Sequence, residues 1–151
     1  MPARTIDTPT GPFEIVEEDG AITRATWQGG GARAESPLLA EAEAQITAYF
    51  EGARTRFDLP LRVVAGPFQR RVCAEIAAIP HGETRTYGEI AARLGKPAQA
   101  VGRGCGGNPI PLLIPCHRVL GATGLGGFSG GVGVETKVWL LRHEGAAGLL
   151  I

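Results

Sequence analysis

One stretch, residues 86–107, contains the pattern that most constrains how this chain can fold. Thr86-Tyr87-Gly88-Glu89 is a capping box, in which a hydroxyl and a carboxylate three residues later satisfy free amides at the start of a helix. The helix that it opens is expected to end at Gly95, and Pro97 begins a second helix that reaches Gly106. Two short helices joined by a tight turn that contains glycine are typical of a helix-turn-helix motif.

The second of these helices is rich in glycine, which opposes helix formation. Gly102, Gly104, Gly106 and Gly107 each cost roughly 1 kcal/mol relative to alanine inside a helix. Such residues are kept where another backbone approaches closely, either a DNA minor groove, which is ~6 Å wide, or a neighbouring helix. Three of the glycines also fit the dinucleotide-binding pattern G-x-G-x-x-G. They end a helix, however, and no strand precedes them, so we expect no nucleotide cofactor.

Cys116 is the candidate nucleophile. It follows the apolar run Ile110-Pro111-Leu112-Leu113-Ile114, which predicts a buried strand, and His117 comes directly after it. The thiolate is the reactive form of cysteine, and a neighbouring base raises its population at neutral pH. Since adjacent residues of an extended chain point to opposite faces, contact between the two side chains needs a bend at Pro115-Cys116 or a bridging water. The alternative is that Cys116 is a small buried apolar residue.

The rest of the chain predicts a mixed α/β architecture. Residues 13–16 and 22–27 flank the turn signal Glu18-Asp19-Gly20 and form a predicted hairpin. A helix is expected from Pro37. Its expected buried face consists of Leu38, Leu39, Ala42, Ile46, Ala48 and Phe50. Further expected elements are a short strand at 62–64 and helices at 68–79 and 136–143.

Charge is distributed unevenly along the chain, although its net value is zero. Residues 1–61 hold five basic and ten acidic side chains, whereas residues 62–151 hold ten basic and five acidic ones. A basic C-terminal part suits a surface that faces phosphates, with an acidic face behind it.

Metals and membranes are not expected partners. The three cysteines (Cys73, Cys105 and Cys116) and the three histidines (His81, His117 and His143) lack the close spacing of metal ligands. No apolar run approaches the ~20 residues needed to span a membrane, so we expect a soluble cytoplasmic protein.

Several motifs in register closely resemble the methylated-DNA–protein-cysteine methyltransferases, also called alkylguanine-DNA alkyltransferases. The matching pieces are Pro67-Phe68-Gln69-Arg70-Arg71-Val72, Ile79-Pro80-His81-Gly82-Glu83-Thr84, Asn108-Pro109, Pro115-Cys116-His117-Arg118-Val119, Phe128-Ser129-Gly130-Gly131 and His143-Glu144-Gly145. The resemblance is strong over about residues 60–146. It implies an N-terminal α/β lobe at 1–62, a ribonuclease H-like roll. It also implies a winged helix-turn-helix lobe at 63–151 that carries the active site.

The resemblance also implies roles for individual side chains. Cys116 would be the nucleophile in a relay that runs through a water to His117 and Glu144. Asn108 would brace the bend that leads to the active site, and Tyr87 would press on the target nucleotide's phosphate and give a proton to the departing guanine. Without the resemblance, Glu144 would be interpreted as a surface carboxylate, Asn108 as a turn residue and Tyr87 as a packed aromatic.

By the same resemblance, four residues would line the substrate pocket and one helix would contact DNA. The pocket residues are Gly127, Phe128, Ser129 and Lys137, and the DNA-binding residues are Gln99, Ala100, Gly102, Arg103 and Gly106. The family usually has an arginine at the position of Gln99, where it fills the stack left by the flipped base. In this chain an arginine stands one helical turn further on, at Arg103.

The implied function is direct DNA repair. The alkyl group on the 6-oxygen of guanine, and by the same chemistry that on the 4-oxygen of thymine, would pass irreversibly to Cys116 in one turnover after base flipping. No cofactor is implied. The partner would be duplex DNA that carries alkylated guanine, bound through its minor groove by a monomer that associates with the nucleoid. A sister group with tryptophan in place of the nucleophile only binds such DNA, and Cys116 places this chain with the reactive group.

Two other functions compete with repair. A winged-helix regulator that senses alkylation at Cys116 would need a further basic DNA-binding module. A cysteine hydrolase with a Cys-His dyad would need an oxyanion site and repeated turnover, and it would not explain the glycine-rich helix.

Overall fold

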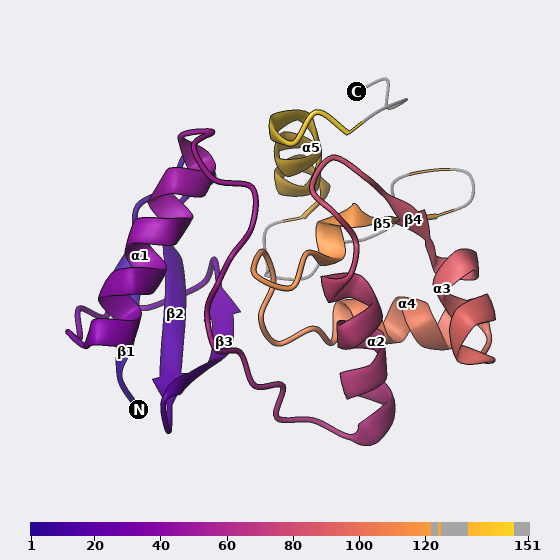
Figure 1. Cartoon of the computed structure of the whole chain (residues 1–151), viewed down its shortest axis with the longest axis horizontal. Coiled ribbons are helices and arrows are strands. Elements are labelled where there is room, and N and C mark those ends of the chain that lie inside the picture. Colours follow the sequence, from indigo (N-terminus) through magenta and orange to yellow (C-terminus); the bar gives the residue numbers. More distant parts are fainter. Residues whose placement is uncertain (122–123, 125–132, 147–151) are drawn as a thin grey trace.

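The computed structural model describes residues 1–121, 124 and 133–146, which form two adjoining lobes (Figure 1). The N-terminal lobe, indigo to purple in the figure, consists of a three-stranded sheet and the helix α1. The C-terminal lobe contains the remaining helices and a small two-stranded parallel sheet. The mixed α/β class predicted from the sequence is confirmed.

The N-terminal sheet is antiparallel, with strand order β1-β2-β3. Its strands are β1 (Ala3–Ile6), β2 (Phe13–Glu18) and β3 (Ala21–Thr26), so the predicted hairpin is confirmed. Asp19 and Gly20 both have left-handed backbones, with φ of 50° and 81°, as a two-residue turn between twisted strands requires. The strand β1 was not predicted, because its four residues bury only Thr5 and Ile6 in succession and show no alternation.

The helix α1 (Pro37–Phe50) lies against β1 and β2 (Figure 1). Ser36 caps it, since the Ser36 hydroxyl accepts a hydrogen bond from the amide of Leu39 at 3.0 Å. The predicted buried face is only partly right. Its buried residues are Leu39, Ala42, Gln45, Ile46 and Tyr49, whereas Leu38, Ala48 and Phe50 are half-buried.

The predicted strand at 62–64 is wrong. Only Leu61 pairs with the sheet, as an isolated bridge to Ile22. The Arg62 amide donates to the Ile22 carbonyl at 3.0 Å, and beyond it the chain leaves the sheet, so that Val64 is 67% exposed. The β-branched residues at this point therefore belong to the connection between the lobes.

The helix-turn-helix is confirmed in the C-terminal lobe. Both bonds of the predicted capping box are present at Thr86, and α3 (Tyr87–Leu94) ends at Gly95 in a left-handed conformation with φ of 65°. The following helix α4 (Ala98–Gly106) packs against α3 and against α2 (Pro67–Ala77). The last helix, α5 (Val134–His143), begins two residues earlier than predicted.

A single apolar core runs through both lobes. It joins residues of the N-terminal sheet, such as Phe13 and Ile15, to residues of the C-terminal lobe, such as Val72 and Ile110. A backbone hydrogen bond from the Ala25 amide to the Pro109 carbonyl, 3.0 Å long, also links the lobes. The N-terminal lobe is thus packed against the segment that leads to Cys116. No helix in the described part of the chain is long and apolar enough to cross a membrane.

Candidate active site

A buried turn, rather than the predicted strand, carries the chain from α4 to Cys116. The side chain of Asn108 closes this turn, since its Nδ2 donates to the Ile114 carbonyl at 2.8 Å and its Oδ1 accepts from the Ile110 amide at 3.0 Å. Leu112 has a φ of 72° inside it, a conformation that only a tight turn demands of a leucine. These two hydrogen bonds hold the bend before the cysteine at the position where the resemblance places Asn108.

The backbone bends sharply at the cysteine itself. Pro115 has φ −80° and ψ 66°, and the Cys116 amide donates to the Ile114 carbonyl at 2.8 Å, which is the geometry of an inverse γ-turn. Cys116–Arg118 then forms one turn of 3-10 helix, η1. Successive side chains of such a turn point about 120° apart. The bend that contact between Cys116 and His117 requires is therefore present.

Glu144, just after α5, accepts hydrogen bonds from two side chains of this turn. Its Oε2 lies 2.7 Å from Nε2 of His117 and 3.0 Å from one terminal nitrogen of Arg118, and its Oε1 lies 2.8 Å from Nε of Arg118. The other terminal nitrogen of Arg118 donates to the Ile79 carbonyl at 2.6 Å. His117, Arg118 and Glu144 are 0%, 7% and 5% exposed. A histidine, a guanidinium and a carboxylate are thus paired almost entirely out of water.

The protonation states follow from this pairing. Burial opposes ionisation of Glu144, but the hydrogen bonds and positive charges of His117 and Arg118 outweigh it and hold the pKa of the carboxyl well below its ordinary value. Burial lowers the pKa of His117, and the neighbouring Glu144 acts in the opposite direction. At neutral pH the resulting state is an ionised Glu144 beside a neutral imidazole.

The sequence reasoning missed two residues of this network. Arg118 stands inside the motif that surrounds the cysteine, but no role was predicted for it. Tyr49 of α1 donates its hydroxyl to Oε2 of Glu144 at 2.6 Å. The helical spacing of Leu39, Ala42 and Ile46 could have indicated that Tyr49 is buried, although it could not have identified its partner.

The three cysteines differ in their surroundings. Cys116, which is 4% exposed, follows the bend described above, whereas Cys73 and Cys105 lie on α2 and α4. Burial raises the pKa of Cys73, and it raises the pKa of Cys105 to about 12, so both stay protonated at neutral pH. Lys137 of α5 is fully buried and donates to the Val119 carbonyl at 2.7 Å. Burial lowers its pKa to about 8, while the nearby Cys116 and Cys105 act in the opposite direction.

The remaining expected site residues are placed as follows. Tyr87, at the start of α3, is half-buried, and the parallel pairing of β4 (Arg85–Thr86) with β5 (Val119–Leu120) brings it beside the strand that follows η1. Gly127, Phe128 and Ser129 lie outside the described residues. No three His, Cys, Asp or Glu side chains are grouped as metal ligands in the part of the chain that the structure covers.

The helix α4 turns one face outward and one inward. Gln99, Arg103 and Gly106 are exposed, and Ala100 and Gly102 are half-buried. The glycines differ in what surrounds them, so the helix-packing explanation applies to only some of the positions. A Cβ on Gly102 or Gly106 would meet nothing within 4 Å, whereas one on Gly104 would stand 2.9 Å from Val72 of α2. Gly104 is therefore needed for helix packing, and the outer two leave the exposed face flat.

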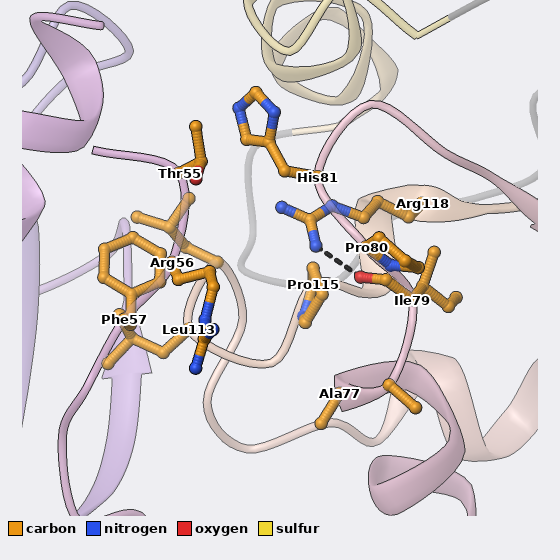
Figure 2. Close-up of a pocket in the computed structure, with 12 residues that line it drawn as sticks. Thr55, Arg56, Phe57, Ala77, Ile79, Pro80, His81, Leu113, Pro115 and Arg118 are labelled. Carbon is orange, nitrogen blue, oxygen red and sulfur yellow. Dashed lines mark hydrogen bonds between the residues drawn. The ribbon is translucent and has the colours of Figure 1, made fainter. Parts of the chain in front are cut away.

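A cavity of about 400 Å³ lies behind the active-site turn, between the connection of the lobes and the C-terminal lobe. Figure 2 shows Phe57 on one side of this cavity, His81 above it, and the guanidinium of Arg118 reaching from the other side with its bond to Ile79. Pro115 contributes to the wall, so the cavity adjoins the Arg118 side of the network.

The fold and the site together define a class of protein in which a helix-turn-helix lobe carries a buried thiol next to a paired imidazole and carboxylate. The family model described as "6-O-methylguanine DNA methyltransferase, DNA binding domain" matches residues 67–146. The corresponding "ribonuclease-like domain" model matches residues 1–63. The chain belongs to the 6-O-methylguanine DNA methyltransferase family.

Individual relatives agree over almost the full length. The methylated-DNA–protein-cysteine methyltransferase of Mycolicibacterium paratuberculosis is 39% identical, over 98% of this chain and 96% of that protein. The constitutive enzyme of Bacillus subtilis is also 39% identical, over 93% of each chain. Among solved structures, the Mycobacterium tuberculosis OGT in complex with DNA superposes with a TM-score of 0.87 at 39% identity, over 96% of this chain and 93% of that one.

Proposed function

We propose that this protein repairs DNA by moving a methyl or larger alkyl group from the 6-oxygen of guanine to Sγ of Cys116. The observation that carries this proposal is the buried turn of η1, in which His117 follows the thiol and is held by ionised Glu144. The sulfur attacks the saturated carbon, and the bond between carbon and oxygen breaks as the new bond to sulfur forms. The guanine departs with the electron pair. Because the carbon is saturated, the reaction needs no oxyanion site.

In this proposal, His117 accepts the proton of the thiol. An ionised Glu144 can only accept hydrogen bonds, so Nε2 of His117 carries a hydrogen and Nδ1 has the lone pair. We expect the proton to pass from Sγ to Nδ1 through a bridging water and Tyr87 to protonate the departing guanine. The ammonium of Lys137 would favour the thiolate by its charge.

The proposed DNA contact is the outer face of α4, which would enter the minor groove of the duplex. Exposed Gln99 and Arg103 and the unobstructed Gly102 and Gly106 support it, because a narrow groove admits a helix only where side chains are small or reach phosphates. The partner is duplex DNA with an alkylated guanine that is flipped out of the stack, bound by a monomer.

The test is stoichiometric. The protein is incubated with an oligonucleotide duplex that carries one 6-O-methylguanine, and its mass and the position of the label are determined. We expect one methyl group per protein molecule, on Cys116, and no further turnover. Repeated turnover would instead indicate a hydrolase, and DNA binding without an adduct would indicate a regulator. A duplex with 4-O-methylthymine measures the substrate range.

Position 99 provides a prediction about base flipping. Extrusion of a base costs a few kcal/mol of unstacking, and a side chain that fills the gap offsets part of it. Since glutamine lacks the charge and the planar fork of arginine, Gln99→Arg should speed repair of duplex DNA and leave the reaction with the free base 6-O-methylguanine unchanged. Arg103→Ala should weaken duplex binding and reduce its salt dependence by about one phosphate contact. Equal acceleration of both reactions by Gln99→Arg would contradict a gap-filling role.

The glycines of α4 provide a matched pair of variants. Gly102→Ala should stabilise the protein by up to about 1 kcal/mol, because its Cβ meets no atom and alanine favours the helix, yet it should weaken duplex binding by filling the face that enters the groove. Gly104→Ala should instead cost about 1–3 kcal/mol, because its Cβ would clash with Val72. Denaturant unfolding and titration with duplex DNA measure the two effects. Unchanged DNA binding by Gly102→Ala would argue against entry of this face into the groove.

A further inference from the structure

A side chain of the N-terminal lobe contacts Glu144 of the proposed relay. Tyr49, in the last turn of α1, is 1% exposed, and its hydroxyl donates to Oε2 of Glu144 at 2.6 Å. The bond joins residues that are 95 positions apart in the sequence. Tyr49 is therefore a buried polar contact from a lobe that has no other expected part in the chemistry.

The ring of Tyr49 is held on several sides. It packs against Phe57 at 5.3 Å between ring centroids, against His143 at 5.0 Å and against His81 at 6.2 Å. The Tyr49 carbonyl lies 2.6 Å from Nε2 of His143, so the backbone of α1 is also attached to the end of α5. Phe57 and His81 also line the cavity into which Arg118 reaches (Figure 2). These contacts leave the hydroxyl little freedom to turn away from Glu144.

Oε2 of Glu144 accepts hydrogen bonds from three donors, and this sharing affects its interaction with His117. Oε2 of Glu144 receives the Tyr49 hydroxyl at 2.6 Å, Nε2 of His117 at 2.7 Å and a guanidinium nitrogen of Arg118 at 3.0 Å. Each donor stabilises part of the negative charge on Oε2, so the hydrogen bond from Tyr49 reduces how strongly this oxygen favours a protonated His117. Oε1, by contrast, receives Arg118 at 2.8 Å.

We propose that Tyr49 is a positioning residue of the relay, which fixes Oε2 of Glu144 and limits how strongly that oxygen supports a positive charge on His117. The inference rests on the proposed function for its consequence in catalysis, but the linkage between Tyr49 and His117 exists without DNA. The hydrogen bonds on Oε2 of Glu144 fix the direction in which Tyr49 changes the pKa of His117. A stronger donor at position 49 lowers the pKa of His117, and loss of the donor raises it.

Other charged groups surround His117 and Glu144, and the test must leave them unchanged. They are Arg118 of η1, Lys137 of α5, and the two histidines His81 and His143, which stand close enough for charge interactions within the cluster. Tyr49→Phe leaves all of them in place and removes one oxygen atom. Arg118 still holds the carboxylate by two bonds, so the geometry of Glu144 should survive the substitution.

The first experiment follows the imidazole of His117 by NMR as the pH of the unreacted, DNA-free protein is varied. Tyr49→Phe should raise the pKa of His117 by up to about one unit of pH, the equivalent of one hydrogen bond. Replacement of Tyr49 by 3-fluorotyrosine, whose hydroxyl is more acidic and donates more strongly, should move the pKa in the opposite direction. The fluorinated protein keeps the packing of the ring, so the test stands even if Tyr49→Phe folds poorly.

Gln45→Met is the matched control. Gln45 is buried one turn earlier on α1. Its hydrogen bonds reach Glu41 at 2.7 Å and the backbone of Asp58 at 2.8 and 3.1 Å, rather than Glu144. The control should lose stability and leave the titration of His117 unchanged. An unchanged titration in Tyr49→Phe and in the fluorinated protein, or an equal shift in Gln45→Met, would overturn the proposal.

The second experiment measures the single-turnover rate with methylated duplex against pH. A protonated His117 cannot accept the thiol proton, so the acid limb of the profile should move to higher pH in Tyr49→Phe. A shift of one pH unit corresponds to about a tenfold loss of rate on that limb. The rate on the alkaline plateau should change much less. Failure of the wild-type protein to take up a methyl group would reject the proposed function, whereas the NMR titration would still decide the linkage.

Discussion

Cys116→Ala is expected to abolish alkyl transfer and to leave binding of duplex DNA within about twofold of the wild type. The substitution removes only the sulfur and its hydrogen. Cys116 is 4% exposed at the start of η1, whereas the proposed DNA-contacting side chains of Gln99 and Arg103 are exposed on α4. Removal of the attacking atom ends covalent chemistry outright, unlike loss of an assisting group. Mass spectrometry of the protein after incubation with methylated duplex, and a fluorescence anisotropy titration with the same DNA, measure the two properties.

The other two thiols provide the control. Burial raises the pKa values of Cys73 and Cys105, so neither should be methylated in the Ala variant. Cys73→Ser should retain full transfer of one methyl group in the otherwise unchanged protein. A methyl adduct mapped to Cys73 or Cys105 in the Cys116→Ala protein would contradict the assignment of the nucleophile.

Glu144→Gln is expected to cost about 3–5 kcal/mol of stability and to slow transfer strongly at neutral pH. The substitution leaves the guanidinium of Arg118 buried without its counter-charge, and this is the usual cost when one partner of a buried ion pair is removed. It also deprives His117 of its carboxylate, which makes the imidazole a weaker base and raises the thiolate pKa. Urea unfolding and the single-turnover rate measure both losses.

The acid dependence of stability offers an independent readout. The folded-state pKa of Glu144 is lower than its unfolded value, so the stabilisation from this group is present above about pH 4.5, the ordinary value, and is lost as the pH falls. The wild type should therefore lose stability on acidification more steeply than Glu144→Gln. Arg118→Met combined with Glu144→Gln should cost less than the sum of the single variants, because no unpaired charge remains.

Glu135→Gln, which alters an exposed carboxylate at the start of α5, should stay within about 0.5 kcal/mol of the wild type. If Glu144→Gln were as stable as this control and kept the acid dependence of the wild type, the ion pair with Arg118 would not be what stabilises the site.

Local patterns were sufficient for much of the C-terminal lobe. The capping box at Thr86, the left-handed Gly95 and the restart at Pro97 act within a few residues of one another, so the helix-turn-helix was predictable from sequence and is present with both capping bonds. The adjacency of Cys116 and His117 identified the candidate nucleophile for the same reason. Resemblance to a family was needed for Glu144, whose sequence position alone suggests a surface carboxylate.

Short-range patterns failed where long-range contacts choose between conformations. The run of residues 110–114 is apolar enough for a buried strand, but the amide of Asn108 satisfies its backbone and folds it into a turn. The β-branched residues at 62–64 favour a strand, yet only Leu61 meets a partner strand. The glycines of α4 could not be sorted into packing and surface positions until Val72 was placed against Gly104.

The sequence by itself determined the mixed α/β class and the helix-turn-helix, and it singled out Cys116 as the candidate nucleophile, because each depends on residues that are neighbours in the chain. Only the tertiary structure decided how the thiol's surroundings are charged. Burial of Arg118 and Glu144 together, and the arrival of Tyr49 from α1, bring ionisable groups from three distant segments out of water. The strength of a charge interaction depends on distance and desolvation in the folded molecule, and neither quantity is encoded in local sequence.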